Sequence, residues 1–267
     1  MDTDYGLELT NNSKASWAFS LPRSETCIMA TSVCKKLCYG NGIRYQSQAQ
    51  KNKRQRNLRT VKLLLQMGGP TLLAENLVLL IDQARPRDWL AAQVTGRSTS
   101  TPWSIRVHDV GDFGHDLNYI EAWRLAIRQR PQCSFWFYTR SFLQADIFDA
   151  LTELASLPNC QGWLSIDSEN ISTGLLAYTQ YDGVWKLAFL QEEPEDLNEN
   201  LLPQIARVAT KGQVVSFPFH RGGYHADPIQ QEGVFTCPAV LGIYKLEASA
   251  NKLRPCQACS FCLPSPV

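Results

Sequence analysis

The sequence predicts an α/β fold with a parallel sheet, closed or partly closed as a (β/α) barrel, followed by a small cysteine-rich extension. Beyond residue 97, short strand-type runs alternate with helix-type runs, which is typical of βαβ units. The 267 residues suffice for one large core. Seven of the nine cysteines lie in two terminal groups, which predicts metal sites. We therefore expect a barrel-like domain over 1–235 and a metal-binding extension over 236–267.

The predicted elements begin with a strand over 16–21, which leads into a cysteine-rich loop. Two helices over 46–66 and 71–83 are separated by a Gly-Gly-Pro run. The alternating part then has strands at 104–110, 134–138, 162–166, 184–190 and 213–217, with helices at 117–130, 143–155, 172–178 and 197–208. A flat doubly wound sheet is the alternative. No Gly-x-Gly-x-x-Gly follows a predicted strand, so a dinucleotide site of the Rossmann type is not expected.

The loop after the first strand carries Cys27, Cys34 and Cys38 at C-x6-C-x3-C spacing. Thiolates are ligands for zinc and for iron-sulfur centres. The segment has no C-x2-C pair and no histidine, so the spacing favours a 4Fe-4S cluster that leaves one iron open to a small ligand. The alternative is three ordinary buried cysteines. The surrounding lysines and glycines indicate a solvated loop.

The second group consists of Cys237 and a C-x2-C-x2-C run, Cys256, Cys259 and Cys262. Four thiols complete a metal site with no outside ligand, so we expect a closed site that is structural or carries electrons. The spacing favours a 4Fe-4S cluster, with zinc as the alternative. Alternatively, Cys237 joins the three N-terminal cysteines in one site, and the last three cysteines belong to another site. Cys133 and Cys160 are isolated and are expected to be core thiols.

Polar residues follow the predicted strands, and in parallel α/β folds the active site lies at these carboxyl ends. All four histidines fall at two strand ends. We predict a catalytic role for His108, Asp112 and Arg140, and a ligand-binding role for Arg106, Asp167, His220 and Arg221. Alternatively, Asp112 organises a turn, and the arginines, which suit carboxylate or phosphate ligands, form ion pairs with strand-end carboxylates.

A basic segment over 44–62 lies in a stretch with no acidic residue between Glu25 and Glu75. It predicts a surface for nucleic-acid phosphates or for an anionic small ligand, and the alternative is a solvated helix face. The formal charge of +1 for the whole chain excludes neither class of partner. Without a secretory signal or a long apolar run, we expect a cytoplasmic protein that does not enter membranes, with its cysteines reduced.

The opening run resembles that of the gene product eighty-eight family of phage and plasmid proteins; it reads SWAFSLPRSETCIMATSVCKKLCYG. The later segments RVHDVGDF, FWFYTRS and the closing CP with CQACSFC follow in the same order as in that family. More distantly, the chain is similar to radical-SAM enzymes, whose three cluster cysteines follow the first strand of a (β/α) barrel, although at C-x3-C-x2-C spacing. That likeness implies S-adenosylmethionine as the ligand of an open cluster.

The first functional hypothesis is therefore an iron-sulfur protein with a radical-SAM-like barrel. One or two 4Fe-4S clusters would be present, and the open one would act on a small molecule or on nucleic acid. The alternative is a non-enzymatic, metal-stabilised protein of phage or plasmid type that binds nucleic acid or senses redox state. The sequence identifies neither a substrate nor an oligomeric state.

Overall fold

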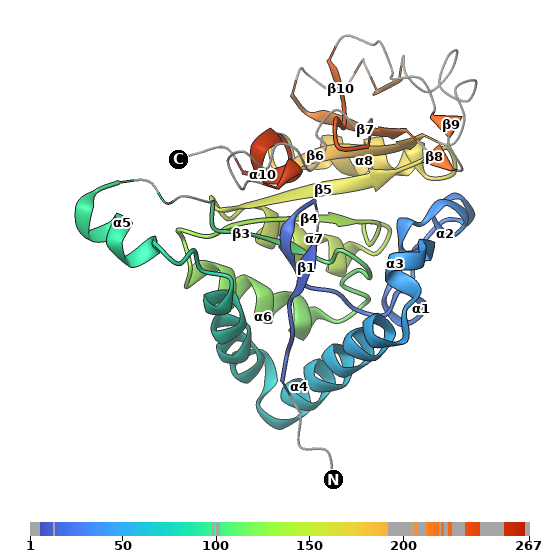
Figure 1. The fold of residues 1–267 in the computed structure, drawn as a ribbon. Helices are drawn as coiled ribbons and strands as arrows, with labels where there is room; N and C mark the ends of the chain where they lie inside the picture. The colour runs from blue at the N-terminus through green and yellow to red at the C-terminus, as the bar shows by residue number, and fades with distance from the viewer. Residues whose placement is uncertain are drawn as a thin grey trace.

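A sheet of eight strands forms the centre of the molecule (Figure 1), in the order β1-β2-β3-β4-β5-β6-β7-β10. The computed structural model describes residues 6–12, 14–97, 99, 102–191, 204–205, 207, 212–218, 220–221, 224–225, 233–240 and 254–264. The strands are β1 Thr10–Asn12, β2 Ser16–Ala18, β3 Ser104–Val107, β4 Ser134–Thr139, β5 Cys160–Ile166, β6 Trp185–Gln191, β7 Val214–Pro218 and β10 Val234–Thr236. A separate two-stranded sheet pairs β8 His220–Arg221 with β9 Tyr224–His225.

Helices connect most of the strands. They are α1 Arg23–Thr26, α2 Ser32–Leu37, α3 Ile43–Gln46, α4 Gln48–Gln83, α5 Trp89–Thr95, α6 Leu117–Arg128, α7 Ala145–Ala155, α8 Ile171–Gln180 and α10 Pro255–Cys259, with a short 3-10 turn, η1, over Tyr39–Asn41. The alternating part of the chain follows the prediction closely, because its apolar runs are long and clearly periodic. The predicted helix over 197–208 lies mostly outside the described residues.

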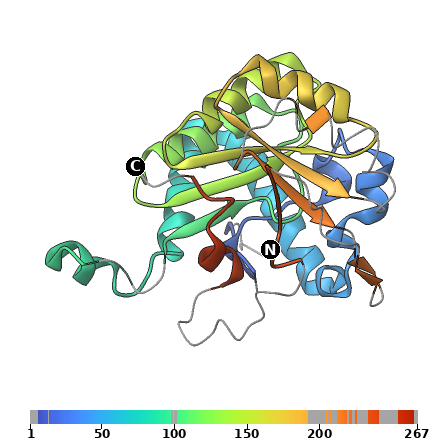
Figure 2. The same ribbon diagram turned by 90° about the horizontal axis from the view of Figure 1, so that it is seen from above.

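The sheet is mostly parallel but does not close into a barrel. Among the described strands of this sheet, only β1 runs antiparallel to its neighbour, β2, and the other neighbouring pairs are parallel. Strand order follows chain order, so right-handed crossovers place the connecting helices on one face. Figure 2 shows α7 and α8 on that face and α10 on the other. The α/β prediction is confirmed, whereas closure of the sheet into a barrel is wrong: β1 and β10 are its two edges.

Side chains alternate between the two faces of the sheet and form two apolar clusters. The larger cluster lies on the helix face and includes Ile105, Phe137 and Leu187. The opposite face, which we call the inner face, carries a smaller cluster of Trp163, Ala188 and Val215, packed against Tyr138, Phe217, Phe235, Cys237, Phe261 and Cys262. The C-terminal segment therefore covers the inner face.

Helix α4 is two helices that meet at a sharp bend (Figure 1). Gly68 and Gly69 leave helical geometry there, and Gly69 has a positive φ of 64° that favours glycine. The break confirms the predicted boundary between the two helices.

By length and apolar composition alone, helix α4 could cross a membrane. Its buried residues, such as Leu73, Leu77 and Ile81, belong to the main core. The absence of membrane contact stays a prediction.

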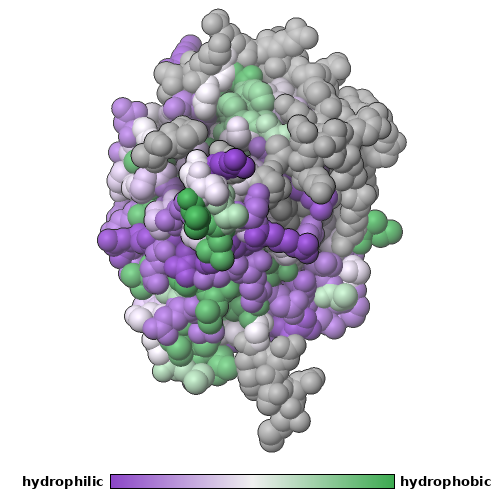
Figure 3. All heavy atoms as spheres, turned by 60° about the vertical axis from the view of Figure 1, so that its left-hand side comes forward, coloured by the Kyte–Doolittle hydropathy of each residue, from purple (hydrophilic) through white to green (hydrophobic). Residues whose placement is uncertain are grey.

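The surface on the side of α5 mixes polar and apolar residues (Figure 3). Leu90 and Val94 of α5 are exposed, and so are Met67 and Leu79 of α4. Trp89 holds α5 to the body of the protein, because its ring contacts that of Trp103 edge-on at 5.8 Å between centroids. Isolated exposed apolar side chains are normal on folded proteins.

Candidate functional site: the cysteine loop and the strand ends

The cysteine loop, residues 27–38, lies between β2 and α4. Cys27 follows the last residue of α1, Cys34 is in the first turns of α2, and Cys38 follows the last residue of α2. All three are half-buried. Thr31 caps α2, because its hydroxyl accepts a hydrogen bond from the Cys34 N–H at 3.0 Å. The loop therefore has a defined local structure that fixes the backbone of Cys34.

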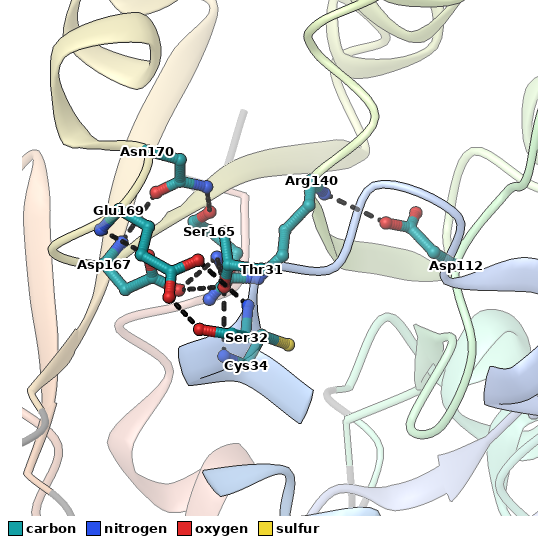
Figure 4. Close-up of polar contacts among 9 residues, drawn as sticks. All are labelled: Thr31, Ser32, Cys34, Asp112, Arg140, Ser165, Asp167, Glu169 and Asn170. Atoms are coloured by element: carbon teal, nitrogen blue, oxygen red, sulfur yellow. Dashed lines mark hydrogen bonds and ion pairs between the residues drawn. The ribbon is translucent and has the colours of Figure 1, made fainter. Parts of the chain in front are cut away.

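Two carboxylates after β5 anchor this loop to the carboxyl edge of the sheet (Figure 4). The Thr31 hydroxyl donates to Asp167 Oδ2 at 2.5 Å. The Ser32 N–H donates to Glu169 Oε2 at 2.9 Å, and the Ser32 hydroxyl donates to the other oxygen of that carboxylate. These hydrogen bonds lower the pKa of Glu169. Residues more than 130 positions apart are thus joined at one edge.

Arg140 and Asp167 form a buried ion pair beneath the loop. Arg140 Nη1 lies 2.6 Å from Asp167 Oδ2 and 3.3 Å from the Thr31 hydroxyl oxygen. The two side chains are 6% and 0% exposed. They follow the neighbouring strands β4 and β5, so the parallel register brings them together. The sequence named both residues, and the structure shows the alternative considered for Arg140, an ion pair with a strand-end carboxylate.

Asp112 joins three segments in the buried region beside this pair. Its carboxylate accepts from the Phe113 N–H at 2.8 Å, the Thr139 hydroxyl at 2.9 Å and the Arg140 N–H at 2.9 Å. Its own N–H donates to the Thr26 hydroxyl at 3.2 Å. Burial raises the pKa of Asp112, and these hydrogen bonds oppose the rise. These contacts agree with the alternative role for Asp112, that of organising a turn.

His108 points into an aromatic part of the core. Its Nε2 lies 2.7 Å from the Tyr119 hydroxyl oxygen, and the centroid of its ring is 4.5 Å from the centroid of the Phe113 ring. The residue is 2% exposed and has a positive φ of 63°. Burial, aided by the Arg106 charge, lowers the pKa of His108 to about 3, so the ring is neutral at physiological pH. The structure therefore does not bring His108 together with Arg140 and Asp167.

Arg106 lies on the inner face, because its neighbours Ile105 and Val107 both belong to the helix-face core. Its guanidinium contacts Asp109 at 3.3 Å and donates to the Tyr39 hydroxyl at 2.6 Å. The same group lies over the Tyr138 ring, 4.9 Å from its centroid. The pair with Asp109 agrees with the alternative to ligand binding that the sequence offered for Arg106. His220 and Arg221 form β8, and their side chains lie outside the described part.

The chain matches the family model described as Gene product 88 over residues 3–264. It belongs to this family. The match confirms the resemblance drawn from the cysteine loop and the later motifs, and it supports a phage protein family. Comparisons with curated proteins and with solved structures found no match.

In this gene product 88 protein, two of the C-terminal cysteines, Cys237 and Cys262, pack against the inner-face cluster. The Trp163 Nε1–H donates to the Cys262 carbonyl at 3.1 Å, and the Cys256 N–H donates to the Lys14 carbonyl at 2.9 Å. Burial raises the pKa of Cys262, and the thiols of Cys256, Cys237 and Cys259 raise it further. The four thiols therefore lie within electrostatic reach of one another.

The sulfur atoms of both groups are not arranged as a ligand set. Among the described residues, no three His, Cys, Asp or Glu side chains form a group that could hold a metal ion. In the cysteine loop, burial raises the pKa of Cys27, with smaller effects from Asp112, Cys34 and Cys38. Burial also raises the pKa of Cys34, opposed by the Arg140 charge. Cys27, Cys34 and Cys38 are thus near enough to affect one another's pKa, but as they stand they do not form a metal-binding group.

Most described cations of the basic segment have partners within the protein. Lys53 and Arg56 pair with Glu8, the first at 3.2 Å, and Lys62 lies 3.9 Å from Glu25. Arg54 is buried and donates to the Tyr45 carbonyl at 2.7 Å. These side chains therefore hold the N-terminal region to α4. Nucleic-acid binding by this segment of the gene product 88 protein stays a prediction.

Sequence reasoning assigned no role to Thr31, Ser32 or Tyr39. Thr31, three residues before Cys34 and followed by a serine, is a recognisable helix start, and this signal could have predicted the cap. Its hydrogen bonds to Asp167 and Glu169 could not be read from the chain, because they join segments that are distant in sequence.

Proposed function

We propose that this is an iron-sulfur protein in which Cys27, Cys34 and Cys38 hold a 4Fe-4S cluster with one iron open to a small molecule. The anchoring of the cysteine loop by Asp167 and Glu169 carries the proposal. Ligands of parallel α/β folds bind at the carboxyl ends of the strands. A loop with three thiols that is fixed at this edge is well placed to present a cluster to a ligand.

The thiols must lose their protons to bind a metal, and metal binding itself drives that loss. Burial raises the pKa of Cys27 and Cys34, so both are protonated at neutral pH. Metal ions bind the thiolate and release protons as they do so. Because the sulfurs do not form a ligand set as they stand, the proposal includes rotation of the three side chains about their Cα–Cβ bonds.

For the C-terminal group we propose a closed centre, either a second 4Fe-4S cluster or zinc. The mutual electrostatic effects of its thiols on the inner face support this assignment. The group comprises Cys237, Cys256, Cys259 and Cys262. Asp112, Arg140 and Asp167 are proposed to support the cysteine loop, since their described polar groups bond to one another and to the loop.

Anaerobically reconstituted protein is expected to contain iron and sulfide and to be brown, with broad absorption near about 400 nm. Cys34→Ala should lose the N-terminal cluster and keep the C-terminal metal, because the two groups are assigned to separate sites. Cys259→Ala should do the reverse. Iron, sulfide and zinc per chain are measured for each protein.

Cys160→Ala is the matched control, since Cys160 is a buried thiol of β5 outside both groups. It should retain the full metal content. Zinc without iron or sulfide would contradict the iron-sulfur proposal. If either Cys34→Ala or Cys259→Ala stays folded and loses all metal, one shared site would replace the two proposed here.

The open iron is expected to bind S-adenosylmethionine, by analogy with radical-SAM enzymes; a likeness of the chain to those enzymes stays a prediction from sequence. Adding this compound to the reduced protein should change the electron paramagnetic resonance spectrum of the N-terminal cluster. Cys34→Ala should show no such change. Identical spectra at saturating ligand, together with salt-sensitive binding of DNA or RNA, would instead favour the non-enzymatic alternative.

A further inference from the structure

Residues 28–37, which we call the lid segment, lie against the carboxyl edge of the sheet with little apolar anchoring (Figure 4). The structure describes all of them, and Val33 is the one buried side chain among them. Val33 belongs to neither of the two apolar clusters, and Ile28 is 53% exposed. Segments that bury little apolar surface are those that open locally in folded proteins. Apolar packing therefore contributes little to holding the lid segment in place.

Both ends of the lid segment are fixed to the body of the protein. Before it, the hydroxyl of the buried Thr26 accepts from the Asp112 N–H at 3.2 Å. After it, the carbonyl of the buried Gly40 accepts a side-chain hydrogen bond at 2.7 Å. Cys27 and Cys38 lie between these anchors and the lid segment, and neither has helical backbone geometry. The two residues are therefore in the positions of hinges.

Glu169 holds the middle of the lid segment. One oxygen of its carboxylate accepts from the Ser32 N–H at 2.9 Å, and the other accepts from the Ser32 hydroxyl. Hydrogen bonds to an ionised carboxylate are roughly twice as strong as those between neutral groups. Both residues are exposed, so water can replace these bonds without leaving a buried group unpaired. The contact is therefore strong enough to close the segment and can also be broken.

The ion pair of Arg140 and Asp167 lies beneath the lid segment. Thr31 contacts both partners, and its hydroxyl oxygen is 3.3 Å from Arg140 Nη1 and 2.5 Å from Asp167 Oδ2. The two charged side chains are 6% and 0% exposed, so solvent hardly reaches them while the segment is in place. Proteins with parallel α/β sheets bind ligands at these strand ends. Movement of Thr31 away from the pair would open this part of the edge.

We propose that residues 28–37 form a lid that opens as a unit over the Arg140–Asp167 pair, with the Glu169–Ser32 contact as its latch. Opening gives small solutes access to the strand ends, and closure shields the strand ends from solvent. Glu169 is a positioning residue in this arrangement. The lid requires no metal at the cysteines, so the inference does not depend on the proposed function.

Hydrogen–deuterium exchange of the full chain tests the lid, with the protein kept metal-free by a chelator and its thiols reduced. The N–H groups of Cys34 and Lys35 both donate to Thr31 in the closed state, so their exchange reports opening. Glu169→Ala should speed exchange over residues 28–37 by about tenfold. Exchange in β5 should stay at the wild-type rate.

Three further variants test whether the latch is this contact. Ser32→Ala removes the hydroxyl and keeps the N–H, so exchange over the lid segment should rise by about threefold. Ser32→Ala combined with Glu169→Ala should exchange no faster than Glu169→Ala alone beyond the loss of the shared contact, because residues in direct contact are not additive. Glu153→Ala removes a carboxylate of α7 that is 70% exposed, and it should match the wild type.

Modification of arginine side chains by phenylglyoxal, located by mass spectrometry, tests what the lid covers. Arg140 should react about tenfold faster in Glu169→Ala than in the wild type, because its reaction requires the open lid. Arg54 is buried outside the lid segment and should react at the same rate in both proteins.

Unchanged exchange over residues 28–37 in Glu169→Ala would overturn the latch. Equally faster exchange in β5 would overturn the lid as a separate unit, because the whole domain would then be opening. Faster exchange over the lid segment with no change at Arg140 would overturn the placement of the lid over the ion pair. The metal content of the reconstituted protein tests the proposed function separately, so failure of one is distinguishable from failure of the other.

Discussion

Replacing Asp167 with alanine is expected to lower the free energy of unfolding by about 3–5 kcal/mol. The change leaves the Arg140 guanidinium buried without its carboxylate, and it removes the acceptor of the Thr31 hydroxyl. An unpaired charge in a site this buried costs far more than the lost contact itself. Urea denaturation followed by circular dichroism measures the effect.

The matched control for this prediction is an exposed ion pair. Glu153 lies 3.8 Å from Arg124 and is 70% exposed, so Glu153→Ala should change stability by less than about 0.5 kcal/mol. Replacing both Arg140 and Asp167 with apolar residues should cost less than Asp167→Ala alone, since no buried charge is then left unpaired. A loss below about 1 kcal/mol for Asp167→Ala would contradict the importance of the pair.

The same substitution tests how the cysteine loop is held. Thr31 caps α2 through the N–H of Cys34 and is itself bonded to Asp167. Loss of this acceptor frees the start of α2, whereas the backbone of the C-terminal cysteines is held by bonds to Lys14 and Trp163. If the proposed function is correct, any folded Asp167→Ala protein should bind the N-terminal cluster less tightly and keep its C-terminal metal.

The sequence was sufficient to predict the alternating elements, because strand and helix periods differ clearly from residue 104 onward. It could not predict whether the sheet closes. Closure depends on which strands meet at the edges, and here β1 pairs with β2 while β10 pairs with β7. Both edge strands have only three residues, so their periodicity carries almost no signal.

The strand-end rule located part of the candidate site. Arg140 and Asp167 follow adjacent parallel strands, so the rule places them together, and they form an ion pair. The rule failed for His108 for a reason of backbone geometry. Strand alternation would place it on the inner face with Arg106, but its positive φ ends the strand and its ring instead meets Tyr119 of α6. A positive φ at histidine cannot be read from sequence.

The buried position of His108 leads to the last prediction, a loss of stability in mild acid. The folded-state pKa of about 3 lies below the ordinary value of 6.5 that applies to the unfolded chain. The unfolded state therefore binds the proton first as the pH falls, so this contribution to stability is fully present above pH 6.5 and declines below it. The expected slope is about 1.4 kcal/mol per pH unit, or about 2 kcal/mol lost at pH 5.

Chemical denaturation of the wild type and of His108→Asn at pH 7 and pH 5 measures this effect. Asparagine tolerates a positive φ and does not titrate, so the variant should be less stable at pH 7 yet lose about 2 kcal/mol less than the wild type on acidification. His115→Asn changes an exposed histidine of the same segment and should follow the wild-type profile. Parallel profiles for the wild type and His108→Asn would show that the ring takes up its proton without leaving the core, which would contradict the neutral, buried histidine described here.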